Sequence, residues 1–160
     1  MRALLAPAVL TLALLCDVPA RASGGEHVVD DAAVETPGTC HVESWTTLSS
    51  RRSGLFNIAP ACTRRLWPNL EIGGFLTHGW SGDAADSIVG LSPKLTLRSE
   101  ERDIGIGLAS SVGFSLGRGR IETASLIVPL TIAAGSRIRF NLNAGWQWSR
   151  SNGHDAFVGA

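Results

Sequence analysis

The sequence predicts an all-β fold, an antiparallel up-and-down meander β-barrel of about eight strands. Large apolar residues alternate with small or polar ones through most of the chain after Cys40, and short glycine-bearing segments separate the alternating runs. The 18 glycines would destabilise a helical domain, whereas they suit strands joined by tight turns.

We interpret residues 1–22 as a secretory signal peptide. Arg2 is its positive flank, residues 3–15 are apolar, and Ala20 and Ala22 are the small residues of a cleavage site before Ser23. The apolar run is too short to cross a bilayer as a helix, so a retained anchor is the less favoured alternative. A lipidated Cys16 is also disfavoured, because a small residue should precede such a cysteine and Leu15 stands there.

The mature chain is expected to hold two regions. Residues 23–39 are polar, contain proline and glycine and show no period, which predicts a flexible lead-in. Residues 40–160 form the predicted β-barrel domain. In an exported chain Cys40 and Cys62 are expected to form a disulfide, because a hairpin centred near Arg51 sets them opposite each other. Two unpaired thiols are the alternative.

The alternating runs predict the strands in chain order. The clearest run, Ile104 to Leu116, has apolar side chains at all its even positions except Ser110, and only Gly, Ala or Ser at its odd positions. The other runs are 40–49, 54–62, 70–77, 89–98, 123–132 and 138–149, and an eighth begins near Asp155. Its shortness predicts a truncated last strand, and therefore either a fragment of a longer chain or an imperfectly closed barrel.

Two further expectations concern the ladder. Pairing the apolar faces of neighbouring runs sets three contacts, which are Leu97 with Ile104, Leu116 with Glu122, and Ile132 with Ile138. Pro93 and Pro129 lie inside predicted strands and have no N–H to donate, so each requires a bulge or a water molecule.

Alternation does not say which face is wet, but three features favour lipid on the apolar face. The long runs match tilted membrane strands, and a face of glycine, alanine and serine suits a crowded interior better than solvent. Trp80, Trp146 and Trp148 lie near strand ends, as interfacial aromatic residues do. The alternative is a soluble periplasmic barrel with its large residues inside, binding a small apolar ligand.

The texture of the chain resembles the broad class of proteobacterial outer-membrane β-barrel proteins. The resemblance covers residues 40–160 and rests on the leader, the long alternating strands, Gly-Ile-Gly-Leu-Ala at 105–109 and Asn-Leu-Asn-Ala-Gly-Trp at 141–146. It implies the outer membrane as location and its lipid bilayer as partner, more than any activity. The alternation and the leader favour a non-enzymatic barrel with a structural or passive transport role. The periplasm is the alternative location, and no solute is indicated.

No catalytic, metal or cofactor site is expected. No serine or aspartate is spaced with a histidine as a nucleophile requires, and His41, His78 and His154 are interpreted as isolated surface residues. The zero net charge provides no basic field for nucleic acid. The polar residues expected to face the interior, as a mutually satisfied network, are Glu71, Lys94, Arg98, Arg139 and Asn141. An eight-stranded interior is just wide enough for side chains, which argues against an open pore.

Overall fold

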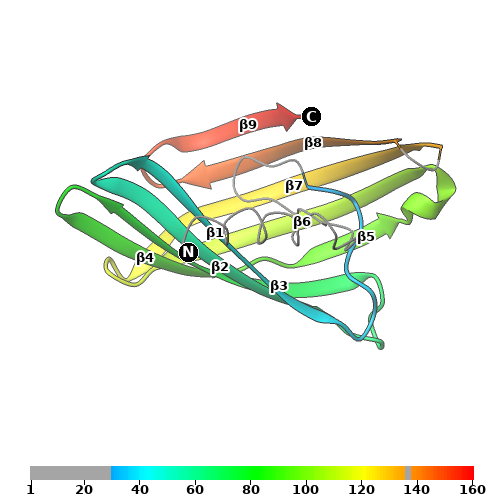
Figure 1. Ribbon diagram of the computed structural model, residues 1–160, viewed down its shortest axis with the longest axis horizontal. Coiled ribbons are helices and arrows are strands. Elements are labelled where there is room, and N and C mark those ends of the chain that lie inside the picture. Colours follow the sequence, from blue (N-terminus) through cyan, green and yellow to red (C-terminus); the bar gives the residue numbers. More distant parts are fainter. Residues whose placement is uncertain (1–29, 136–137) are drawn as a thin grey trace, which may run out of the picture.

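The computed structural model describes residues 30–135 and 138–160, which form one antiparallel sheet of nine strands (Figure 1). The predicted all-β class is confirmed, whereas the predicted signal peptide and residues 23–29 lie outside the described residues. No helix in the described ranges is long and apolar enough to cross a lipid bilayer. The elements are β1 (Cys40–Ser50), β2 (Ser53–Thr63), β3 (Leu70–Ser81), β4 (Ala84–Leu91), β5 (Lys94–Arg98), the 3₁₀ helix η1 (Glu100–Arg102), β6 (Ile104–Ser115), β7 (Arg120–Ala134), β8 (Ile138–Ser149) and β9 (Gly153–Gly159).

The nine strands occupy eight positions in the sheet, because β4 and β5 both lie between β3 and β6. Otherwise each strand pairs with the next along the chain, which is the predicted meander. The interruption falls at Ser92 and Pro93, where proline cannot donate to the ladder. The chain still runs alongside its neighbours there, since Ser92 N donates to Gly73 O (2.9 Å) and Ser110 N donates to Pro93 O (3.0 Å).

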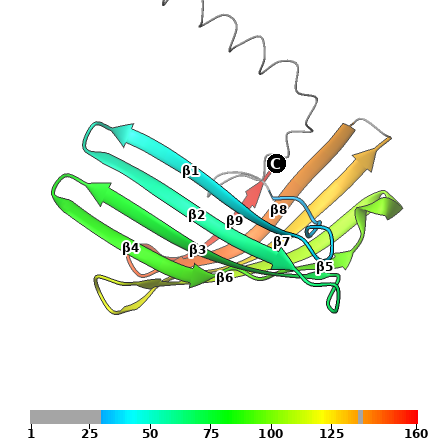
Figure 2. The same ribbon diagram turned by 60° about the horizontal axis from the view of Figure 1, so that its bottom comes forward.

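The sheet is strongly curved and open in this structure. Strands β1 and β9 stand at the two ends of the strand order, and no second partner strand is found for either among the described residues. Figure 2 shows the sheet bent into a trough, with the blue segment that begins at residue 30 inside the curve. A closed barrel is therefore not formed by the ladder itself.

The predicted register is correct at the first hairpin and is displaced at the later ones. Cys40 lies opposite Cys62, as expected. At the β6–β7 hairpin the predicted contact of Leu116 with Glu122 is not formed, because a register shift after Gly113 sets Phe114 opposite Ile121. At the β7–β8 hairpin Ile132 lies opposite Phe140, two residues from the predicted partner Ile138. A shift of two residues leaves each side chain on its own face, so alternation cannot distinguish these registers and turn length decides.

The ladders contain three register shifts, of which the first lies between Leu48 and Ser50 in β1. The other two change which face nearby residues occupy. In β5 the register shifts between Thr96, opposite Gly107, and Arg98, opposite Ile106, so Leu97 has no partner in the ladder and does not face Ile104. Another shift follows Gly113 in β6. Each bulge sets an extra residue against its partner strand and increases the bend of the sheet.

Apolar and polar side chains are distributed over the two faces of the sheet in the opposite way to a water-soluble protein, in which large apolar side chains are buried. The convex face carries most of the exposed large side chains, while the concave face carries buried polar ones. Ala32 is the single hydrophobic residue classed as buried in the described ranges, at 1% exposure. The exposed set includes Phe56, Ile72, Leu76, Val89, Val112, Phe114, Leu126, Val128, Phe140, Leu142 and Val158, and the buried polar set is Asn57, Thr63, Glu71, Ser115, Glu122, Thr131 and Asn143.

Candidate functional site

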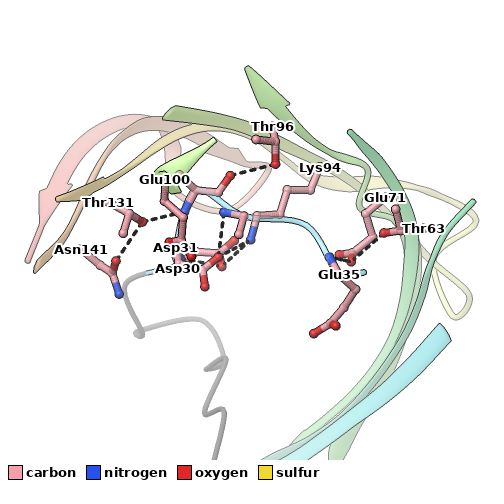
Figure 3. Close-up of polar contacts among 12 residues, drawn as sticks. Asp30, Asp31, Glu35, Thr63, Glu71, Lys94, Thr96, Glu100, Thr131 and Asn141 are labelled. Carbon is pink, nitrogen blue, oxygen red and sulfur yellow. Dashed lines mark hydrogen bonds and ion pairs between the residues drawn. The ribbon is translucent and has the colours of Figure 1, made fainter. Parts of the chain in front are cut away.

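The candidate site is the concave face together with residues 30–35, which we term the lead segment. This segment lies within the curve of the sheet before the chain enters β1 (Figure 3). Side chains from β2, β3, β5, β7 and β8 surround it, so distant parts of the chain converge here.

Lys94, at the start of β5, makes a double ion pair with the lead segment. Its Nζ lies 2.9 Å from Asp30 Oδ1 and 3.1 Å from Asp31 Oδ1. The side chain of Lys94 is only 12% exposed, whereas those of Asp30 and Asp31 are 35% and 38% exposed. A lysine ammonium needs a partner when it leaves water, and two adjacent carboxylates provide it.

Ala32 is fixed through its backbone. Its N–H donates to Thr131 Oγ1 (2.9 Å), and its carbonyl oxygen accepts from Thr96 Oγ1 (3.0 Å). The Thr131 hydroxyl donates in turn to Asn141 Oδ1 (2.9 Å). Both polar backbone groups of a buried residue are thus satisfied by side chains from two strands, as burial requires.

Two glycines of β6 leave the space that Ala32 occupies. A Cβ added to Gly105 would lie 3.1 Å from Ala32 Cβ, and one added to Gly107 would lie 3.1 Å from Ala32 O and 2.9 Å from Pro129 Cγ. All three distances are shorter than ordinary van der Waals contact. The small-residue pattern of this strand therefore allows a second layer of chain to pack against the sheet.

The ends of the lead segment are also attached. At its end near β1, Glu35 N donates to Glu71 Oε2 (3.1 Å), and Thr63 Oγ1 donates to the same oxygen (3.4 Å). At its start, the Asn143 amide, oriented to satisfy both neighbours, accepts from Asp30 N (2.7 Å) and donates to Asp30 O (3.0 Å). The prediction of a flexible lead-in therefore does not describe residues 30–35, because strand side chains hold this part of the chain at several points.

A cavity of about 660 Å³ remains beside the lead segment. Charged side chains of both signs line it, among them Glu43, Glu71, Lys94 and Arg139, together with His41. Within the part of the chain that the structure describes, no three His, Cys, Asp or Glu side chains are grouped to hold a metal ion.

The structure places the five predicted interior residues in different settings. Glu71, Lys94 and Asn141 join the contacts of the lead segment. Arg139 borders the same cavity and pairs with Glu100 of η1, Nη2 to Oε1 at 2.8 Å. Arg98 is exposed and lies opposite Ile106, beyond the bulge in β5.

The predicted disulfide is confirmed. Cys40 and Cys62 are bonded across the β1–β2 ladder, and their Cα atoms are 4.1 Å apart. The bond joins an edge strand to its neighbour near the point where the chain leaves the lead segment.

Aromatic residues gather toward one end of the sheet. The rings of His78 and Trp80 are stacked, with centroids 6.1 Å apart, near the β3–β4 turn, and those of Trp146 and His154 are stacked at 5.6 Å near the β8–β9 turn. The Arg150 guanidinium lies 5.8 Å from the centre of the Trp148 ring. Up-and-down order places both turns at the same end of the strands.

Sequence reasoning missed the residues that bind to one another across long separations, namely Asp30, Asp31, Thr96 and Thr131. Two signals were available. Asp30 and Asp31 are adjacent carboxylates in a region without lysine or arginine, and the odd positions of β6 are smaller than an interior packed only by strand side chains requires.

A family model matches residues 10–159 of the chain, and its description is "Uncharacterised conserved protein UCP029691". No curated protein and no solved structure matches significantly.

Proposed function

The chain belongs to the UCP029691 family, and we propose that it is an outer-membrane β-barrel protein with a structural or passive transport role. We propose no enzymatic activity for this protein. The proposal rests on the distribution of side chains between the two faces of the sheet rather than on any likeness to a protein of known activity.

The observation that carries the proposal is the apolar convex face. Leu126 is 46% exposed, Val128 is 42% exposed and Leu142 is 38% exposed, all in the middle of their strands. In a soluble barrel such residues point inward, and monomeric soluble proteins rarely expose contiguous apolar patches above roughly 300–600 Å². Lipid acyl chains would cover this apolar face without removing polar groups from water, because the polar side chains lie together on the concave face.

Closure of the barrel is part of the proposal. Eight strand positions leave β1 and β9 antiparallel, which is the orientation that lets the first and last strands of an up-and-down barrel pair. An unpaired strand edge in hydrocarbon would cost several kcal/mol for each unsatisfied backbone group. We therefore propose that β1 and β9 pair in the membrane.

The alternative, a soluble periplasmic carrier of a small apolar ligand, requires the large residues to line an interior. An apolar hollow of about 600 Å³ does exist, and Ile106, Val128, Leu142 and Val158 are among its lining residues. It lies on the convex side of the sheet, near the β9 edge, because these residues alternate with those of the concave face. An acyl chain of the bilayer could fill such a hollow, so this feature favours the membrane proposal.

Cell fractionation tests the proposal. We expect the full chain, expressed with its own leader in a Gram-negative host, to sediment with outer membranes and to require detergent for extraction. Unheated samples should migrate faster on denaturing gels than boiled ones, as compact barrels do. A monomer in the soluble periplasmic fraction, with the same mobility before and after boiling, would refute the proposal.

A further inference from the structure

The lead segment occupies the space that an eight-stranded barrel would otherwise leave as its lumen. We propose that residues 30–35 are a plug that Lys94 holds inside the barrel, and that displacing this plug opens a path for small ions. The inference rests on the proposed function, since a lumen exists only if the sheet closes.

The first support is steric. Strands of an eight-stranded barrel usually fill the interior with their own side chains. Here the odd positions of β6 carry Gly105, Gly107, Ala109, Ser111 and Gly113, which cannot do so. A Cβ added to either of the first two glycines would lie 3.1 Å from an atom of Ala32, which is closer than ordinary van der Waals contact. The interior is therefore lined by small residues where the segment lies, and the segment fills part of the space that they leave.

The second support is the specificity of the contacts between the lead segment and the strands. Every contact that holds the segment runs from a strand side chain to a defined group, either a backbone group of Asp30, Ala32 or Glu35 or a carboxylate of Asp30 or Asp31. A passing stretch of coil would not require matched donors and acceptors from β3, β5, β7 and β8. These contacts form a docking site for a short extended acidic peptide, and the chain's own segment occupies it.

The third support is the position of Lys94, whose ammonium group pairs with two adjacent carboxylates. Replacing it by a carboxylate would place three negative charges together in a site of low exposure, which would expel the segment. Arg139 borders the same cavity, but its partner is Glu100 and not the segment. Changing Arg139 therefore alters the charge of the lumen without releasing the plug.

The test compares three variants of the full chain, Lys94→Glu, Lys94→Arg and Arg139→Glu, with the wild type. Each protein is reconstituted into phosphatidylcholine vesicles and planar bilayers. Hydrogen–deuterium exchange of the peptide covering residues 30–39 reports whether the segment is docked, and ion current in 1 M KCl reports whether the lumen conducts.

We expect Lys94→Glu to exchange this peptide at least tenfold faster and to raise the mean current at least tenfold. Lys94→Arg and Arg139→Glu should stay near the wild type in both measurements. Wild-type exchange in Lys94→Glu would show that Lys94 does not hold the segment, and fast exchange without added current would show that the segment is not a plug. Either result overturns the inference.

The proposed function fails in a different way. If no variant floats with vesicles in a density gradient, the chain is not a membrane barrel, and the plug falls with it. If the vesicles carry the protein but the currents of all variants are equal, the barrel stands and only the plug is refuted.

Discussion

Lys94 Nζ lies 2.9 Å from Oδ1 of Asp30, a residue 64 positions earlier in the chain, and this ion pair joins the lead segment to β5. We expect Lys94→Met to lower the free energy of unfolding by about 1–3 kcal/mol, because it leaves two adjacent carboxylates without their common cation. Urea unfolding in detergent micelles would measure the change. The matched control is Arg139→Met, whose more exposed ion pair should contribute less than about 1 kcal/mol. Equal losses in the two variants would contradict the account.

The space left by Gly107 leads to the second prediction. Gly107→Ala brings a methyl group to 3.1 Å from Ala32 O and 2.9 Å from Pro129 Cγ, so we expect a loss of about 1–3 kcal/mol and faster proteolysis before β1. Gly79→Ala is the control, because an added Cβ there has no atom within 4 Å. The idea fails if both substitutions leave stability and proteolysis unchanged.

The disulfide leads to the third prediction. Cys40 and Cys62 are separated by 22 residues and join β1 to β2. Replacing both by serine should destabilise the protein by about 2–4 kcal/mol, mainly because the unfolded chain regains the freedom of the closed loop. The urea midpoint in detergent measures this effect. The wild type in reducing agent should shift by a similar amount, and a stability that reduction leaves untouched would contradict the prediction.

The proposed pairing of β1 with β9, which would close the barrel, leads to the fourth prediction. Val42, Ser44 and Thr46 of β1 lie on the same face as Ala156 of β9. Each of the three β1 residues is replaced by cysteine, one at a time. The experiment uses a chain in which Cys16 is replaced by serine. In membranes, oxidation should form a disulfide within one chain between at least one of these cysteines and the cysteine introduced by Ala156→Cys. Ile72→Cys, on that same face but in β3, should not link to this cysteine. Products found only as cross-linked dimers would argue against closure.

Much of the fold could be predicted from the sequence, because a period of two reports directly which side chains share a face. The Cys40–Cys62 pairing follows from that period and a tight turn. The bulge at Leu97 and the shifted partner of Ile132 could not be predicted, since displacements of this kind depend on turn geometry and local twist. Arg98, which follows this bulge, shows how one extra residue alters a facial assignment.

The contacts of the lead segment could not be predicted from local sequence patterns, for a different reason. Thr96 and Ala32 are 64 residues apart, and no periodic pattern in residues 30–35 marks them as a layer on the sheet. What the sequence did contain was the complementary feature, the run of glycine, alanine and serine in β6. Its meaning becomes clear only when Ala32 is seen to fill the space.

Contact between the convex face and lipid can be measured with spin labels. Labelled cysteines at Leu108, Leu126 and Leu142, with Ser111 and Ser125 as concave-face controls, are compared for relaxation by oxygen dissolved in the bilayer and by a water-soluble nickel chelate. We predict strong oxygen and weak nickel effects at the three leucine positions, with little oxygen effect at the two serine positions. Leucine labels that respond to the nickel chelate, or to neither agent, would contradict the proposed contact with lipid.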